Sequence, residues 1–348
     1  MVKADFSQKI LEWYQEHQRD LPWRLTKDPY HIWLSEIILQ QTRVVQGTPY
    51  YHKFVEAFPT VHDLAQASEE KVLKLWQGLG YYSRARNLHA TAKMVSEEFE
   101  GEFPNTYEGL KQLKGVGDYT ASAIASISFD LPEPVVDGNV YRVLARYFGV
   151  DLAINSPEGV KYFKTLAREV MDTKNIRDYN QGIMEFGAIQ CAPKKPYCLV
   201  CPIQSDCVAL NTNQVSVLPK KLNKTKVKQR FFDYLVLLDS EKNTVLEQRT
   251  QKGIWYKLYQ FPLIEGKKVE TLDTMREQIQ GLPSLPKIQS ISLYNEKPVV
   301  HKLSHQHLNT RFWIVKTEES LDQGIPWKTV EDYPVPVLIS DFLTAFKI

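Results

Sequence analysis

The chain has 348 residues, of which 43 are Lys or Arg and 41 are Asp or Glu, so its formal net charge is +2. A hydrophobic share of 43% and a charged share of 24% exclude a disordered or collagen-like chain. The near-zero net charge argues against a nucleic-acid-binding protein, because that class is usually strongly basic. The length predicts two or three domains.

The first residues of the chain and its apolar runs indicate the cellular location of the protein. No run approaches the length of a membrane helix, and the first residues lack the apolar stretch of a signal peptide. We therefore expect an intracellular protein, cytoplasmic or associated with the nucleoid, that binds no membrane and is a monomer.

Residues 5 to about 210 are predicted to be mainly helical. Apolar residues recur at helical spacing in the first segment, at Phe6, Ile10 and Trp13, and again along residues 83–99. Glycines and prolines interrupt the pattern and predict short helices with tight connections. We interpret the apolar stripes as core, with no functional role.

The composition changes at residues 220–230, where six basic residues occur without an acidic one. This run predicts a solvated linker. Beyond it, residues 231–239 and 243–250 are expected to form two strands of one hairpin, and residues 310–317 a later strand. The last third of the chain is therefore predicted to be an α+β domain.

All four cysteines lie in the seventeen residues from 191 to 207, in the pattern C-x6-C-x2-C-x5-C. Without an export signal a disulfide framework is improbable, and four thiols this close together indicate metal ligation. Thiolates are ligands for both zinc and iron–sulfur clusters. The spacing by itself leaves both open.

A glycine hairpin, Gly115–Val116–Gly117, lies between two helical patterns in the string L-K-G-V-G-D-Y-T-A. Such a turn lets backbone N–H groups and the start of a helix approach a phosphate. Twenty residues after Gly117, the string V-V-D-G-N-V contains Asp137. Taken alone, Asp137 is best explained as the cap of a helix over residues 138–148.

A third candidate is Glu36, in the apolar string W-L-S-E-I-I-L-Q-Q-T-R-V. A buried carboxyl among such neighbours would hold its proton more tightly than usual. A surface glutamate on an amphipathic helix is the plain alternative.

Together, the glycine hairpin, the downstream aspartate and the cysteine array resemble the helix-hairpin-helix DNA glycosylases that carry a [4Fe-4S] cluster. The Glu36 string and the string G-L-G-Y-Y-S-R-A-R-N-L look like the adenine-pocket segments of the MutY branch. Endonuclease III-like enzymes have a lysine in the hairpin helix, where this chain has Tyr119. The resemblance covers essentially the whole chain. It implies an all-α glycosylase core followed by an α+β domain similar to Nudix hydrolases.

The resemblance also implies a division of the chain and a metal centre. We expect residues 1–21 and 131–212 to form a helical domain that carries the cluster, and residues 22–130 a six-helix domain with the hairpin. A basic linker over 213–228 and a Nudix-like domain over 229–348, which recognises 8-oxoguanine, would follow. The [4Fe-4S] cluster would bind Cys191, Cys198, Cys201 and Cys207.

For the chemistry, the resemblance implies that the enzyme hydrolyses the N-glycosidic bond of adenine opposite 8-oxoguanine, or guanine, in duplex DNA. Glu36 would protonate N7 of the flipped adenine, and Asp137 would stabilise the oxocarbenium-like sugar or attack it transiently. Asn139 would orient Asp137 or a water, with Tyr119 alongside. Because Tyr119 replaces the lysine, Schiff-base strand cleavage is not expected. The enzyme would therefore be monofunctional.

Further residues are assigned by the same resemblance. Gln41 and Tyr81 would wedge into the base stack, and Arg24 and Gln181, with Arg19 nearby, would contact the adenine edge. Ser304 and His305 would read 8-oxoguanine or a nearby phosphate, in a loop of sequence L-S-H where the family has F-S-H. Leu303 thus departs from the family pattern.

Three other functions are weighed. An endonuclease III-like enzyme acting on oxidised pyrimidines is disfavoured by Tyr119 and by the additional domain. A non-catalytic iron–sulfur DNA-binding or redox-sensing protein is disfavoured by Glu36 and Asp137. A pyrophosphatase is disfavoured because the Arg276–Glu277 pair lacks the glutamates that should follow it in a Nudix helix.

Overall fold

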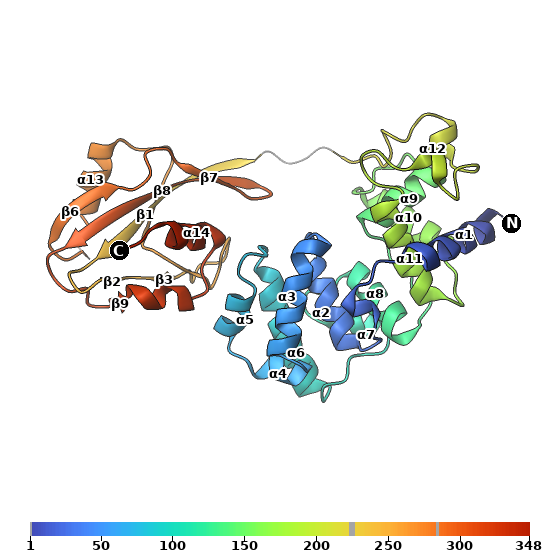
Figure 1. The fold of residues 1–348 in the computed structure, drawn as a ribbon, viewed down its shortest axis with the longest axis horizontal. Coiled ribbons are helices and arrows are strands. Elements are labelled where there is room, and N and C mark those ends of the chain that lie inside the picture. The colour runs from blue at the N-terminus through green and yellow to red at the C-terminus, as the bar shows by residue number, and fades with distance from the viewer. Residues whose placement is uncertain (1, 223–226, 283–284) are drawn as a thin grey trace. The chain divides into compact units, whose positions relative to one another are not determined.

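The structure is a computed structural model that describes residues 2–222, 227–282 and 285–348. Part of the predicted basic linker, residues 223–226, lies outside the described residues. The chain forms two compact units, one of residues 1–66 and 87–223 and one of residues 67–86 and 224–348 (Figure 1). No helix of the described ranges has both the length and the apolar character to cross a membrane.

The first unit is all-helical, as predicted. Its helices are α1 Val2–His17, α2 Pro29–Leu39, α3 Val44–Ala57, α4 Val61–Gln66, most of α6 Ser83–Glu98, α7 Tyr107–Gln112, α8 Asp118–Phe129, α9 Gly138–Tyr147, α10 Pro157–Val170, α11 Ile176–Ile189 and α12 Val208–Asn211, with short 3-10 turns at Pro22–Arg24 and Cys198–Val200. Side-chain caps begin several of them: Thr106 accepts a hydrogen bond from the Gly109 N–H, and Ser156 accepts one from the Gly159 N–H. The short helices therefore begin where the sequence offers a cap.

The core of this unit lies between long helices that pack in pairs. α1 packs along α11, α11 along α9, and α2 along α8. Phe6 of α1, Trp33 of α2 and Phe186 of α11 are fully buried. Burial of aromatic side chains of this size is the main stabilising contribution in such a core.

The second unit combines one segment of the helical region with the C-terminal third of the chain. Its elements are α5 Glu69–Leu75, the start of α6 Ser83–Glu98, β1 Lys228–Leu238, β2 Asn243–Thr244, β3 Glu247–Gln248, β4 Tyr259–Gln260, β5 Leu263–Gly266, α13 Leu272–Gln280, β6 Ile288–Leu293, β7 Val299–Lys302, β8 Gln306–Thr317, β9 Ile325–Pro326, a 3-10 turn Trp327–Asp332 and α14 Val337–Ala345. The main sheet has the order β5-β1-β8-β6, and β7 also pairs with β8. β1 and β8 run parallel, from Lys228 opposite Gln306 to Leu238 opposite Lys316, while the other pairings of this sheet are antiparallel. The α+β prediction is confirmed.

Each face of this sheet is covered by a helix. On one face, Leu235, Leu237 and Trp313 pack with Met275 and Ile279 of α13. On the other face, the rings of Phe312 and Phe342 stack with their centres 4.1 Å apart, which joins α14 to β8. The successive β8 residues Phe312 and Trp313 therefore face opposite sides of the sheet and belong to two different cores.

The predicted hairpin of residues 231–239 and 243–250 is wrong. The first segment is β1, but its two sheet neighbours are β5 and β8. Within the second segment only β2 and β3 are extended, and they pair with β9 and β4. Both edges of β1 are occupied by strands distant in sequence, so the next segment has no edge to pair with.

Candidate active site

A cavity of about 700 Å³ opens in the first unit. Five stretches of the described chain line it: residues between 19 and 24, the end of α2 and the turn after it, the glycine hairpin with the start of α8, residues 136–141, and α11. It brings together Glu36, Tyr119, Asp137 and Asn139, four predicted catalytic residues that lie up to a hundred positions apart in the sequence.

Glu36 lies on α2 and is only 9% exposed. Burial raises the pKa of its carboxyl to about 7, the negative charge of Asp137 adds to the rise, and a hydrogen bond from Tyr119 opposes it. A carboxyl with this pKa is half protonated at neutral pH and can donate its proton. The surface alternative for Glu36 does not hold.

Asp137 caps α9, and its Oδ1 accepts hydrogen bonds from the N–H groups of Asn139, at 2.9 Å, and Val140, at 2.8 Å. Its Oδ2 accepts a third from the side-chain amide of Asn139, at 2.8 Å. Burial raises the pKa of this carboxyl above its usual value, and these N–H donors and Arg142 offset only part of that rise. The two carboxyls therefore differ in surroundings: Asp137 meets several donors that favour its anion, whereas Glu36 meets one.

A chain of hydrogen bonds leads from Asp137 to the cysteine loop. Asn139 contacts Asp137, and Arg142 donates to Asn139 Oδ1 at 2.9 Å. Arg142 also donates through Nε to the carbonyl of Cys191 at 2.7 Å. Asn139 thus holds the Asp137 carboxylate while α9 is fastened to the start of the cysteine loop.

Arg19 and Arg24 converge on Glu185, a residue of α11 that the sequence analysis missed. Arg19 forms a bidentate ion pair with the Glu185 carboxylate, with both N–O distances at 2.6 Å. Arg24 Nη2 lies 2.9 Å from Oε2 of the same carboxylate. All three residues line the cavity. The sequence did carry a signal, because Glu185 lies in the apolar string I-M-E-F-G, much as Glu36 lies among apolar neighbours.

Gln181 is buried in α11, one turn before Glu185, and is not among the side chains that line the cavity. Its assignment to the adenine pocket stays a prediction. The α11 residues that line the cavity are Met184, Glu185 and Ala188.

The glycine hairpin has the form expected of a close-approach turn. Gly115 has φ +81°, and a Cβ on it would lie 2.8 Å from Cβ of Asn87. Gly117 is the N-cap residue of α8, and a Cβ on it would have no heavy atom within 4 Å. Val116 is buried, and its N–H donates to the Leu113 carbonyl at 3.1 Å. The free face of the turn is therefore at Gly117 and the start of α8.

Two residues predicted to wedge into DNA, Gln41 and Tyr81, have left-handed backbones, with φ 56° and 48°. Neither is glycine, so each conformation is strained. Gln41 is exposed at the rim of the cavity of the first unit. Tyr81 is 46% exposed and belongs to the second unit.

The second unit has its own pocket, of about 370 Å³, which is lined by residues 80–83, Arg86, residues 253–255 and residues 302–306. The L-S-H string forms the tight turn between β7 and β8, where the Leu303 N–H donates to the Gln306 carbonyl at 2.8 Å. In this pocket the hydroxyls of Tyr81 and Ser304 are hydrogen-bonded to each other. Ser304 and His305 are exposed, and Leu303 is half-buried.

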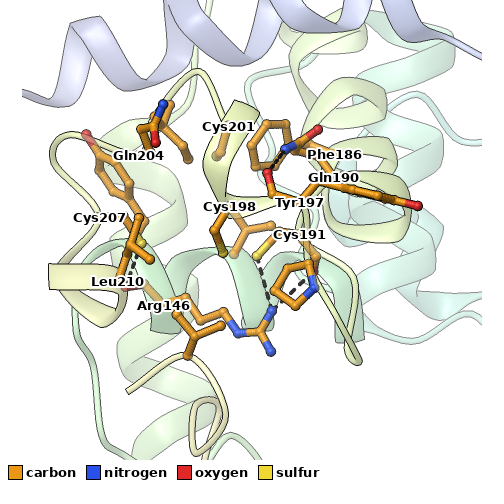
Figure 2. A pocket seen from close by; sticks show the side chains of 15 residues that line it. Arg146, Phe186, Gln190, Cys191, Tyr197, Cys198, Cys201, Gln204, Cys207 and Leu210 are labelled. Atoms are coloured by element: carbon orange, nitrogen blue, oxygen red, sulfur yellow. Dashed lines mark hydrogen bonds between the residues drawn. The ribbon is translucent and has the colours of Figure 1, made fainter. Parts of the chain in front are cut away.

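The four cysteines surround one small hollow between α9, α11 and the loop after α11 (Figure 2). Among the described residues, no His, Asp or Glu side chain lines this hollow. Arg146 Nη1 donates a hydrogen bond to Cys191 Sγ, at 3.4 Å. The donor set is thus four thiols with a cation beside one of them.

In the described ranges, no group of three or more His, Cys, Asp or Glu stands close enough to hold a single metal ion. A tetrahedral zinc with sulfurs at 2.3 Å needs them about 3.8 Å apart. A four-iron cluster binds one cysteine at each iron, so its sulfurs stand farther apart. A set of four thiols can hold either a zinc ion or an iron–sulfur cluster.

The chain is similar to known proteins along most of its length. Residues 34–168 match the HhH-GPD superfamily of base excision DNA repair proteins, and residues 233–345 match the NUDIX domain. An adenine DNA glycosylase of Buchnera aphidicola subsp. Acyrthosiphon pisum is 35% identical over 312 residues, which cover 89% of this chain and 86% of that protein. The adenine DNA glycosylase of Homo sapiens is 45% identical over 213 residues, or 59% of this chain and 39% of the human protein.

Among solved structures, a thermostable thymine-DNA glycosylase is 32% identical, with a TM-score of 0.56, over 60% of this chain and 97% of that one. A non-covalent endonuclease III–DNA complex has a TM-score of 0.52 at 21% identity, over 60% of this chain and 94% of that one, and shares the fold. The chain belongs to the adenine DNA glycosylase family, within the HhH-GPD superfamily of base excision DNA repair proteins.

Proposed function

We propose that this chain is a monofunctional glycosylase that hydrolyses the N-glycosidic bond of adenine opposite 8-oxoguanine in duplex DNA. The observation that carries the proposal is the pairing of Glu36 and Asp137 in one cavity with different surroundings. A glycosidic bond breaks fastest when one carboxyl donates a proton and another is ionised beside the sugar. The names of the relatives support adenine as the base removed.

In the proposed reaction the target adenine leaves the duplex and enters the cavity. Glu36 donates its proton to N7 of adenine, and the bond between N9 and the sugar carbon breaks with its electron pair going to the base. Asp137 stabilises the positive sugar, and a water adds there and gives up one proton. The products are free adenine and an abasic site, and Glu36 is reprotonated from that water or from solvent.

Residues around the two carboxyls position them and the DNA. Asn139 fixes the Asp137 carboxylate, and Tyr119 donates to Glu36. Arg19, Arg24 and Glu185 form a charged wall that can present donors and acceptors to the base edge. Gly117 and the N-terminus of α8 would bind a phosphate through backbone N–H groups. Because Tyr119 supplies no amine, no Schiff base forms and the DNA strand stays uncut.

For the base opposite adenine, the pocket of the second unit is the proposed reader. Tyr81 and Ser304 meet there, and His305 lies on the same turn. A serine hydroxyl and an imidazole can each donate or accept a hydrogen bond, as the N7–H and O8 groups of 8-oxoguanine require. The Nudix-like domain would read this base without hydrolysing a nucleotide.

The cofactor proposal is a [4Fe-4S] cluster held by Cys191, Cys198, Cys201 and Cys207. When bound, it would tie residues 191–207 into one rigid loop against α9 and α11. The colour and metal content of the purified protein test this: a yellow-brown protein with about four irons supports the cluster, and a colourless protein with zinc contradicts it.

The glycosylase proposal is tested on a labelled duplex with one adenine opposite 8-oxoguanine. We expect release of adenine and alkali-labile sites, without strand cleavage before alkali. Asp137→Asn should lower the single-turnover rate by on the order of 10³-fold, because a neutral amide cannot stabilise the cation. Asp151→Asn, at an exposed aspartate, is the matched control. Full activity of Asp137→Asn would contradict the proposal.

A further inference from the structure

Lys164 lies on α10, outside the set of residues that line the active-site cavity. Its ammonium meets three acceptors: Asp118 Oδ2 at 3.0 Å, Ser122 Oγ at 2.7 Å and the Pro134 carbonyl at 3.1 Å. A lysine has three N–H donors, so its hydrogen-bonding capacity is complete. The side chain is 19% exposed. These three hydrogen bonds hold the Lys164 side chain in one position, unlike that of a solvated surface lysine.

Two of the three acceptors belong to the hairpin helix, and the third belongs to the segment that leads to Asp137. Asp118 and Ser122 occupy the first two turns of α8, directly after the glycine hairpin. Pro134 lies three residues before Asp137. Lys164 therefore joins the element that would bind a phosphate to the segment that carries the catalytic carboxylate.

A second link runs along the same path. The side-chain amide of Asn180 donates to the Glu133 carbonyl and to Ser126 Oγ, both at 2.8 Å, and its oxygen accepts from the Val135 N–H at 3.3 Å. Asn180 is 1% exposed. The segment 133–135 is thus fastened to α8 twice, from α10 by Lys164 and from α11 by Asn180.

Lys164 also balances a charge where DNA would approach. Asp118 is the first residue of α8, and a carboxylate there would repel a phosphate at the same helix end. The Tyr107 hydroxyl donates to this carboxylate, and the ammonium groups of Lys111 and Lys164 lie 5.3 and 5.4 Å from the Tyr107 ring centre. Burial works to raise the pKa of Asp118, but the hydrogen bonds from Tyr107 and Lys164 outweigh it and lower that pKa. Asp118 is therefore ionised and compensated by its neighbours.

We propose that Lys164 is a positioning residue that couples the DNA-holding hairpin to the loop carrying Asp137. When a phosphate of the DNA binds at the start of α8, Lys164 sets the position of residues 133–137 relative to that DNA strand. The inference rests on the proposed function. It assigns the coupling to a residue that touches neither the base nor the sugar.

The first test needs no DNA. In Lys164→Met, backbone amide hydrogen exchange should become faster over residues 133–140 than in the wild type. Lys161→Met, which removes an exposed lysine one turn earlier on α10, is the matched control and should leave that exchange unchanged. Unchanged exchange in Lys164→Met would overturn the proposal. This result does not depend on the substrate, so it stands apart from any failure of the wild-type protein to release adenine.

The second test separates charge from position by measuring DNA affinity and the single-turnover rate at saturating DNA. We expect Lys164→Met to bind more weakly and to react on the order of tenfold to a hundredfold more slowly, because small displacements of a catalytic group are costly. Adding Asp118→Asn to Lys164→Met removes the uncompensated carboxylate and should restore affinity but leave the rate low. If the double variant recovers the full rate, Lys164 acts by charge alone and the proposal is overturned. A lower unfolding temperature with an unchanged rate at saturation would overturn it as well.

Discussion

The cavity of the first unit and the pocket of the second unit are built in opposite ways. Glu36 is 9% exposed and Glu185 is 1% exposed, and they are held among residues from distant parts of the chain. Ser304 and His305 are exposed on a single tight turn. The protonation state of a buried carboxyl is set by the protein groups around it. An exposed turn has few such neighbours, so its conformation becomes fixed only when a ligand binds. We therefore expect substitutions to be far more costly in the cavity than in the pocket.

The largest effect is expected at Glu36. Glu36→Gln keeps the shape but cannot donate a proton to the base, so the single-turnover rate should fall by roughly 10²–10⁴-fold. The exposed Glu16→Gln on α1 is the control. A residual rate within threefold of the wild type would show that the proton comes from elsewhere.

The pH profile sharpens the same point. Burial raises the pKa of Glu36 to about 7, and the proposed role needs its protonated form. The rate at saturating DNA should therefore be highest below pH 7 and fall as the pH rises through about 7. In Glu36→Gln this descending limb should disappear. If the limb persists unchanged in the variant, another group is responsible for it.

A smaller effect, on stability, is expected at Glu185. Burial alone would raise the pKa of its carboxyl, but hydrogen bonds from Arg19 and Arg24 lower it from 4.5 to about 2. In Glu185→Gln, an amide N–H₂ would face two guanidinium groups, so the free energy of unfolding should drop by about 3 kcal/mol at pH 7. Urea unfolding measures this drop, with Glu16→Gln again as control.

The pH dependence of that drop has a definite sign. Because the pKa is depressed in the folded state, the stabilisation is present above pH 4.5 and is lost as the pH falls through about 2. The difference between wild type and Glu185→Gln should therefore shrink in acid. A difference that does not depend on pH would mean that packing, and not the ion pairs, is lost.

The sequence predicted the helical front, the α+β rear and the family, because each depends on local patterns. Glu36 and Asp137 could be chosen from their apolar and glycine-flanked strings, although only the fold places them in one cavity. The strand pairing of residues 231–250 could not be predicted, since β1 pairs with β5 and β8, and β8 lies some eighty residues away. Net charge was a poor guide: a total of +2 points away from DNA, yet the chain belongs to a family of DNA repair proteins. The anion site proposed at the start of α8 would use backbone N–H groups, which no charge count includes.

The smallest expected effect concerns the pocket of the second unit. Tyr81 and Ser304 share one hydrogen bond, so Tyr81→Phe and Ser304→Ala each remove the same interaction. Each should weaken binding to DNA that contains 8-oxoguanine by about 1 kcal/mol, or roughly fivefold. The double variant should lose little more than either single one, which gives a coupling energy of about 1 kcal/mol. Affinity for a duplex with guanine at the same position is the reference. Additive losses, or equal losses on both duplexes, would show that these hydroxyls act apart and that the turn does not read the lesion.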